Sequence, residues 1–179
     1  MSNIKLNFKI ILFGFIVTFF SSFGQSFFIG LFNSNIRAEL NITHGQFGSI
    51  YALATLLSSF SLIWIGKKID DFKLINFSFF VIFLLFFSSI FFSLVNSIYF
   101  LFIGIFFLRL SGQGLMSHMA TTSISRFFSL NRGKALSISW LGLSLAEFVL
   151  PITMIFFLSI YSWRSIWISI GLFIVLFLD

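Results

Sequence analysis

The sequence predicts an all-α integral membrane protein with six transmembrane helices. Hydrophobic residues make up 59% of the 179-residue chain and charged residues 9%, whereas about a quarter of the residues in a typical water-soluble domain are charged. The apolar residues gather into six runs, most of them as long as the roughly 20 residues that a spanning helix needs. These runs lack the period-two alternation of membrane strands. Six spans would leave no room for a soluble domain beside them.

The predicted helices are bounded by polar segments, and the first two carry further signals. The first run is longer than the core of a signal peptide and lacks a small-residue cleavage site, so we expect a retained helix. The second run begins at Thr43 and Gln46, whose spacing fits a capping box. The predicted helices cover residues 8–32, 45–65, 74–95, 98–124, 135–161 and 165–179.

The last run is too short for a complete span. Residues 165–178 would rise only about 21 Å at 1.5 Å per residue, against a hydrocarbon core of roughly 30 Å. A chain end at Asp179 would also leave a carboxylate and a terminus within the bilayer, which is costly. We therefore expect that the natural chain continues past Asp179.

The net charge of +6 is explained by membrane topology rather than by nucleic acid, because the basic residues stand at the ends of the apolar runs. One side of the membrane would carry most of them, namely Lys5, Lys9, Lys67, Lys68, Lys73, Arg126, Arg132 and Lys134. The other side would carry Arg37 and Arg164. The positive-inside rule therefore predicts a cytoplasmic N-terminus. We expect location in a bacterial inner (plasma) membrane, with the lipid bilayer as a partner and no nucleic acid.

The sequence lacks the common motifs of soluble enzymes and of metal and cofactor sites. The chain has no Cys, which excludes disulfides, thiol catalysis and Cys-ligated metals. It contains no phosphate-binding loop, dinucleotide fingerprint, zinc motif or nucleophile elbow. We therefore expect no enzymatic activity, no cofactor and no bound metal.

The chain contains an internal repeat. A shift of 88 positions places Gly24-Gln25 on Gly112-Gln113, two of the three Gly-Gln pairs in this sequence. The same shift equates the first predicted helix with the fourth and the second with the fifth, which would run in opposite directions across the membrane. This relation is typical of the inverted repeats of transporter halves. The predicted fold is therefore six transmembrane helices arranged as a 3+3 inverted repeat.

The loop between the second and third predicted helices reads Gly66-Lys67-Lys68-Ile69-Asp70-Asp71-Phe72-Lys73. With its Gly followed four residues later by Asp, it resembles the signature cytoplasmic loop of the major facilitator superfamily. In that family the Asp pairs with an Arg near the fourth loop, as a latch that favours the outward-facing state. The resemblance assigns this gating role to Gly66, Asp70 and Arg132. Asp71 and Phe72 replace the usual basic residue and Gly, so we expect a weakened latch.

Two further segments extend the resemblance over the whole chain. Residues 108–114, Leu-Arg-Leu-Ser-Gly-Gln-Gly, are similar to the family's intramembrane Arg motif. The fifth predicted helix carries Gly142, Ala146 and Pro151 but lacks the Gly-Pro pair of the antiporter motif, which argues against a drug antiporter. The resemblance implies the N-terminal half of a twelve-helix transporter, with the C-terminal half of the same protein as its partner.

Arg109 is the leading candidate for a solute site, because it lies about 16 Å along the fourth predicted helix, near the membrane midplane. Gln113 shares its helix face, whereas His118 points the opposite way. Glu147 lies at a similar depth on the fifth helix, so an ion pair with Arg109 is geometrically plausible. With Gln25 of the first helix, these residues form the predicted substrate-binding or coupling set: Gln25, Arg109, Gln113 and Glu147. Purely structural ion pairing and interhelical hydrogen bonding are the alternatives.

The predicted function is secondary active transport of a small solute by alternating access, coupled to protons. A midplane arginine points to an organic anion such as a monocarboxylate, held by charge-assisted hydrogen bonds. Glu147 is the candidate carrier of the coupling proton. Two alternatives stay open: proton-driven export of hydrophobic compounds, and a non-transporting membrane scaffold or half-sized remnant.

Overall fold

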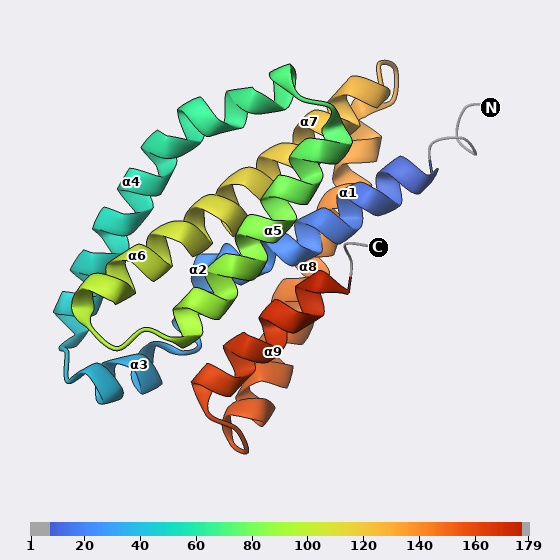
Figure 1. The fold of residues 1–179 in the computed structure, drawn as a ribbon. Helices are drawn as coiled ribbons and strands as arrows, with labels where there is room; N and C mark the ends of the chain where they lie inside the picture. Colours follow the sequence, from blue (N-terminus) through green and yellow to red (C-terminus); the bar gives the residue numbers. More distant parts are fainter. Residues whose placement is uncertain (1–7, 177–179) are drawn as a thin grey trace.

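The computed structural model describes residues 8–176, and every element in that range is helical (Figure 1). Lys5 and the predicted end of the sixth helix lie outside the described residues. In chain order the elements are α1 (Phe8–Ser21), the 3₁₀ turn η1 (Ser22–Gly24), α2 (Ser26–Gly30), α3 (Asn33–Leu40), α4 (His44–Asp71), α5 (Leu74–Ser93), α6 (Ile98–Leu108), the π-helical segment η2 (Arg109–Met116), α7 (Ser117–Phe127), α8 (Arg132–Leu158) and α9 (Trp163–Val175).

Five stretches of the described chain are long and apolar enough to cross a membrane. They are Phe8–Gly30, His44–Asp71, Leu74–Ser93, Ile98–Phe127 and Arg132–Leu158. Each of the five overlaps one of the predicted helices. The remaining apolar helix, α9, has 13 residues and is shorter than a span.

The ends of α4 follow from its local sequence. Thr43 Oγ1 accepts a hydrogen bond from the backbone N–H of Gln46 at 3.2 Å, and Gln46 Oε1 accepts one from the N–H of Thr43 at 2.8 Å, so the predicted capping box is confirmed. α4 continues past the predicted end at Ile65 to Asp71. The charged residues that end the apolar run can remain helical, and an ion pair of Lys68 with Asp71 at 3.1 Å supports the last turn.

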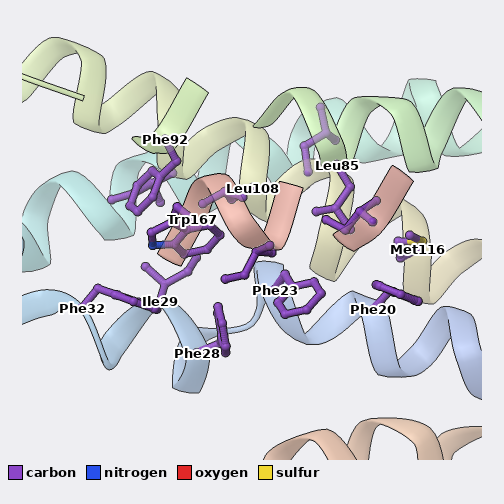
Figure 2. Packing of buried hydrophobic residues seen from close by; sticks show 14 of the residues in the cluster. Phe20, Phe23, Phe28, Ile29, Phe32, Leu85, Phe92, Leu108, Met116 and Trp167 are labelled. Atoms are coloured by element: carbon purple, nitrogen blue, oxygen red, sulfur yellow. The ribbon is translucent and has the colours of Figure 1, made fainter. Parts of the chain in front are cut away.

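The helices pack around a core rich in aromatic rings. α1 packs mainly against α8 and α5 against α9, while α4 lies along α6 and η2. Trp167 of α9 is fully buried at the centre of one group (Figure 2). Its ring centroid lies 4.8 Å from that of Phe92, 5.3 Å from that of Phe32 and 5.5 Å from that of Phe28. These edge and tilted contacts join three separate stretches of the chain.

Much of the outer surface is apolar. α4 and α8 are the least buried of the five membrane-length stretches, with 11% and 22% of their most apolar windows buried. Their exposed side chains include Leu53, Phe60, Phe148 and Ile152. Water disfavours a continuous surface of this kind, whereas lipid or a further part of the protein can cover it.

The bundle has two ends, which are named here by their connections. The α3 end carries α3, the α5–α6 connection and the α8–α9 connection (Figure 1). The opposite end carries the α4–α5 and α7–α8 connections and is called the α4–α5 end (Figure 1).

Candidate functional site

Two membrane-length helices lose their regular α-helical geometry at the same place. The first, predicted as one helix over residues 8–32, is interrupted by η1 and by Gln25, whose backbone is extended with φ −79° and ψ 155°. The fourth changes from α6 into the π-helical η2 at Arg109. η1 and η2 pack against each other. Because π-helical turns are rare and occur frequently at functional sites, this crossing is the candidate functional site.

Glycines allow the two backbones to touch at the crossing. A Cβ atom added to Gly24 would lie 2.3 Å from the carbonyl oxygen of Leu108 and 2.7 Å from the Cα of Gly112. A Cβ added to Gly112 would lie 2.6 Å from the Cα of Gly24. No side chain fits at such distances, so both positions require Gly. These are the glycines of the two Gly-Gln pairs that the repeat aligns.

Arg109 occupies the centre of this crossing with 6% of its surface exposed. Its Nη1 donates to the carbonyl oxygen of Gly24 at 3.1 Å and to Ser26 Oγ at 3.3 Å. Its guanidinium carbon lies 5.4 Å from the ring centroid of Tyr51, whose hydroxyl donates to Ser26 Oγ at 2.9 Å. The interrupted first helix and α4 therefore hold the guanidinium between them.

The predicted ion pair of Arg109 with Glu147 is not formed. Ion pairs among residues 8–176 join Lys68 with Asp71, Arg126 with Asp70 and Arg164 with Glu39, and none includes Arg109. The reason lies in the packing, because α1 contacts α8 on one side and η2 on another. Arg109 turns toward η1 and α4, while Glu147 is exposed on α8.

Four polar side-chain atoms beside Arg109 or along the neighbouring turns are buried without a hydrogen-bond partner. Within the described part of the chain they are Arg109 Nε, Gln113 Oε1, Ser117 Oγ and Thr55 Oγ1. Residues 109, 113 and 117 recur every four positions and so follow one face of the helix. Thr55 stands one turn after Tyr51 on α4, on the side that contacts η2.

The direction of this face follows from the glycines on both sides of Gln113. Gly112 touches Gly24 of η1, and a Cβ added to Gly114 would lie 3.3 Å from the Leu62 side chain of α4. Gln113 therefore points into the seam between the first helix and α4. Gln25 is half-buried at the same crossing and directly precedes Ser26. The structure thus places Arg109, Gln113 and the backbone beside Gln25 at one crossing, while Glu147 is exposed on α8.

Sequence reasoning missed several residues of this seam. Ser26, Tyr51, Thr55 and Ser117 were not among the predicted site residues. Tyr51 and Thr55 have a helical spacing that puts them on one face, but Ser58, Ser59 and Ser61 follow within the same helix. Only the packing of α4 against η2 separates the two that face Arg109 from the rest.

A second group of polar contacts lies at the α4–α5 end. Asp70, at the end of α4, forms an ion pair with Arg126 of α7, and both terminal nitrogens of Arg126 also donate to the carbonyl oxygen of Ile69 at 3.3 Å. Asp70 is thus paired with an Arg near the fourth loop, as the resemblance implies; this residue is Arg126, whereas Arg132, which was assigned to the gate, is not its partner. Arg126 ends a helix that packs on α4, whereas Arg132 is the first residue of α8.

His118 adds a further contact between α7 and α4. Its Nε2 donates to the carbonyl oxygen of Gly66 at 3.1 Å, in the first position of the gating motif. The side chain of His118 therefore faces α4. Its role as a hydrogen-bond donor between helices was not predicted.

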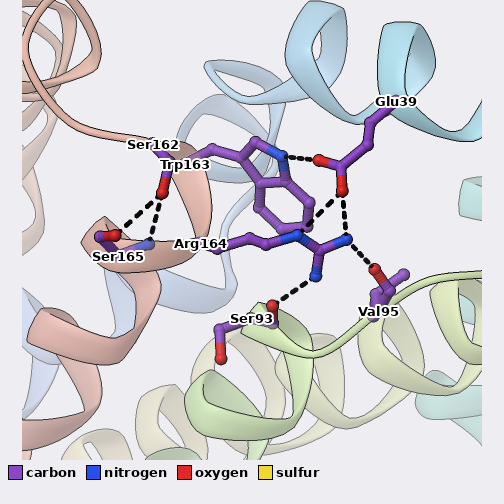
Figure 3. Close-up of polar contacts among 7 residues, drawn as sticks. All are labelled: Glu39, Ser93, Val95, Ser162, Trp163, Arg164 and Ser165. Carbon is purple, nitrogen blue, oxygen red and sulfur yellow. Dashed lines mark hydrogen bonds and ion pairs between the residues drawn. The ribbon is translucent and has the colours of Figure 1, made fainter.

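At the α3 end, Glu39 and Arg164 link α3, the start of α9 and the α5–α6 connection (Figure 3). Glu39 of α3 accepts hydrogen bonds from Arg164 Nη2 at 2.6 Å and from Trp163 Nε1 at 2.7 Å. Arg164 also donates to the carbonyl oxygens of Ser93 and Val95, each at 2.5 Å. The hydrogen bonds from Arg164 lower the pKa of Glu39 below its ordinary value of 4.5, burial opposes this shift, and the bond from Trp163 adds to it.

Five membrane-length apolar stretches and an arginine buried at the crossing of two interrupted helices are the features of a polytopic membrane protein. The family model of the Major Facilitator Superfamily matches residues 14–178, which is nearly the whole chain. The chain therefore belongs to this superfamily of membrane transporters, and it is an integral membrane protein. No curated protein and no solved structure matches the chain.

Proposed function

We propose that this chain is the N-terminal six-helix half of a secondary transporter that moves a small organic anion by alternating access. The observation that supports the anion is Arg109, which is buried near the middle of its helix and has no carboxylate partner within the described residues. A carboxylate of the solute would supply the missing countercharge through charge-assisted hydrogen bonds.

The arrangement around Arg109 suits a site that alternates between occupied and empty. Gly24, Ser26 and Tyr51 hold one edge of the guanidinium, while Nε lacks a partner. The neutral oxygens and the ring fix the position of Arg109 without neutralising its charge. An incoming anion would therefore meet a positioned cation in surroundings that contain little water.

The proposed fold has α9 as a sixth transmembrane helix and places the six helices in a 3+3 inverted repeat. The contact between the repeated Gly-Gln pairs supports it, because symmetry-related segments of such repeats meet at the solute site. The exposed apolar faces of α4 and α8 would be covered by lipid and by a C-terminal half. The α4–α5 end would face the cytoplasm of a bacterial cell, as would the N-terminus.

We assign gating to the α4–α5 end. Gly66 and Asp70 of α4 are tied to α7 by His118 and Arg126, and these bonds would hold the cytoplasmic side closed. Arg132 lies in the adjoining connection and stays a member of the proposed gate through its charge. Access from the cytoplasm would require α4 and α7 to separate.

Proton coupling is proposed for Glu147. It is the one carboxylate of residues 8–176 that lies inside a membrane-length helix and away from its ends. An acidic residue at that depth is costly unless it has a role in coupling. Since it does not pair with Arg109, it would exchange its proton on the face of α8 that a C-terminal half would cover.

An apolar cavity supports the alternative function, which is export of hydrophobic compounds. A cavity of about 630 Å³ lies between α1, η1, α8 and α9, with Phe19, Phe23, Met154 and Phe157 in its lining. This volume suits a drug-sized molecule. The cavity lacks the charged groups that an anion would need, so the two candidate functions make different predictions about Arg109.

The test is uptake of labelled organic acids by cells that express the full reading frame, with an imposed inward proton gradient. We expect accumulation in the wild type and its loss in Arg109→Gln at equal membrane abundance. Arg37→Gln is the matched control, since Arg37 is half-buried at the α3 end and donates through Nε to Asn33 at 2.8 Å. Equal uptake by wild type and Arg109→Gln would overturn the anion site and favour export of hydrophobic compounds.

A further inference from the structure

The seam beside Arg109 contains buried polar atoms that a simple anion cannot all hydrogen-bond. Its atoms without partners differ in chemistry: Arg109 Nε is a donor, Gln113 Oε1 is an acceptor, and the hydroxyls of Ser117 and Thr55 can act as either. A carboxylate at neutral pH has two acceptor oxygens and no donor. It can serve Arg109 and the two hydroxyls, but it cannot serve Gln113 Oε1.

The positions of these atoms set the size of a complementary ligand. Gln113 lies one turn from Arg109, where side chains on the same helix face are about 6 Å apart. Ser117 lies a further turn toward the α4–α5 end, so the group extends over two turns of the helix. A molecule with a carboxylate at Arg109 would reach Gln113 with a substituent two or three bonds away.

The positive charge of Arg109 decides whether an ammonium group or a hydroxyl is the better hydrogen-bond donor to Gln113 Oε1. An ammonium group could donate to Gln113 Oε1, but it would then lie close to the guanidinium of Arg109. No carboxylate among the described residues pairs with Arg109, and Glu147, the acidic residue of the neighbouring spans, is exposed on α8. A neutral hydroxyl donates the same hydrogen bond without repulsion.

We propose that the solute is a hydroxycarboxylate, with its carboxylate on Arg109 and its hydroxyl donating to Gln113 Oε1; this inference rests on the proposed anion site. A solute in the seam must supply the hydrogen bonds that these four buried atoms lack, or it loses affinity. An acid of the same length without the hydroxyl would leave Gln113 Oε1 buried and unsatisfied, and would therefore be disfavoured.

The experiment compares acids that differ only in the hydroxyl. Uptake of lactate against propionate, 3-hydroxybutyrate against butyrate, and malate against succinate is measured in cells expressing the full reading frame. Uptake by cells with Arg109→Gln is subtracted, which removes passive permeation of the protonated acids. We expect at least one hydroxylated acid to exceed its partner by about tenfold or more.

Two variants connect that preference to the seam. Gln113→Met keeps the length of the side chain and removes the acceptor, so the preference should fall toward one through loss of the hydroxylated acid alone. Ser117→Ala should reduce the preference in the same direction, because the solute hydroxyl that donates to Gln113 Oε1 can also accept a hydrogen bond from Ser117 Oγ, one turn further along the helix. Ser125→Ala is its matched control, because it also removes a buried hydroxyl without a partner, about 12 Å nearer the α4–α5 end, and should change nothing.

The outcomes separate this inference from the function on which it rests. Equal Arg109-dependent uptake of both members of every pair, or preference for the acid without the hydroxyl, would overturn the hydroxycarboxylate and leave the anion site standing. Absence of Arg109-dependent uptake of any acid would overturn both. If Gln113→Met does not reach the membrane, the comparison of Ser117→Ala with Ser125→Ala decides alone, and equal preferences in the two would count against the proposal.

Discussion

Arg109 is a charged residue buried where two interrupted membrane-length helices cross. A charged side chain at the centre of a membrane helix costs about 2.5 to 3.5 kcal/mol on insertion scales, and the surrounding backbone and hydroxyl oxygens recover part of this by hydrogen bonding. An apolar residue would pack at the crossing without that cost. The arginine is therefore poorly explained by stability alone, which favours a role in binding.

Gly112 provides a test of the crossing at the same scale. In Gly112→Ala the added Cβ would lie 2.6 Å from the Cα of Gly24, so the two backbones must separate. We expect a loss of about 1 to 3 kcal/mol of stability and a large loss of transport, because the movement displaces Arg109. Thermal unfolding in detergent and uptake in cells measure the two effects.

Gly133→Ala is the matched control, since no heavy atom lies within 4 Å of an added Cβ at that position. It should unfold at the wild-type temperature or slightly above it, because Ala favours helix at the start of α8. A Gly112→Ala protein that behaves like Gly133→Ala would show that the crossing opens without cost.

At the scale of elements, the sequence predicted the positions of the helices better than their internal geometry. Hydropathy and the capping box at Thr43 depend on residue type, which is visible in the sequence. The break at Gln25 and the π-helical turn at Arg109 depend on two backbones approaching each other, which no window along one helix records. The repeated Gly-Gln pairs were the only trace of this contact in the sequence.

The sequence also did not determine which charged residues form ion pairs with each other. Arg126 and Arg132 both stand near the α7–α8 connection, and helix ends with their packing decide that Arg126 meets Asp70. The same holds for Arg109, whose expected partner Glu147 is separated from it by α1. Depth in the membrane could be estimated from sequence, whereas direction around the helix axis required the neighbouring helices.

The contact between α4 and α7 predicts how the gate responds to loss of one charge. Asp70→Asn removes the ion pair with Arg126 but leaves the bonds to Ile69 and Gly66. Since the side chains of Arg126 and Asp70 are 40% and 71% exposed, the pair is worth about 1 kcal/mol or less, and the open population should rise by no more than about fivefold. The seam should become more accessible from the cytoplasm.

This accessibility is measurable because these 179 residues contain no Cys. A Cys placed by Ser117→Cys reports the seam, and its labelling by a membrane-impermeant thiol reagent is followed in inside-out vesicles, with the labelling of the same protein without Ser117→Cys subtracted. Asp71→Asn is the control, because it breaks the exposed pair with Lys68 within α4 and no contact between helices. Faster labelling in both variants, or in neither, would contradict a gate at Asp70.

Across the whole molecule, the cluster around Glu39 unites α3 with the α5–α6 and α8–α9 connections. Its members are distant in sequence, which explains why no local pattern predicted it. The hydrogen bonds from Arg164 lower the pKa of Glu39 in the folded protein, so the folded state binds the proton less readily than the unfolded state. The cluster therefore stabilises the fold above the ordinary pKa of 4.5, and this stabilisation is lost as the pH falls through the lower, folded value.

The lowered pKa of Glu39 predicts a pH-dependent difference in unfolding temperature between the wild type and Glu39→Gln. The wild type should unfold at the higher temperature at pH 7, and the gap should narrow as the pH is lowered from about 4.5, because protonated Glu39 resembles Gln. The carboxylate is 45% exposed and screened by water, so the gap at pH 7 should correspond to about 1 kcal/mol or less. Thermal unfolding of both proteins in one detergent, from pH 7 to pH 3, measures it, with Asp71→Asn as a control that should show little effect. A gap that stays constant over this range, or widens in acid, would mean that the ionised carboxylate does not hold the α3 end together.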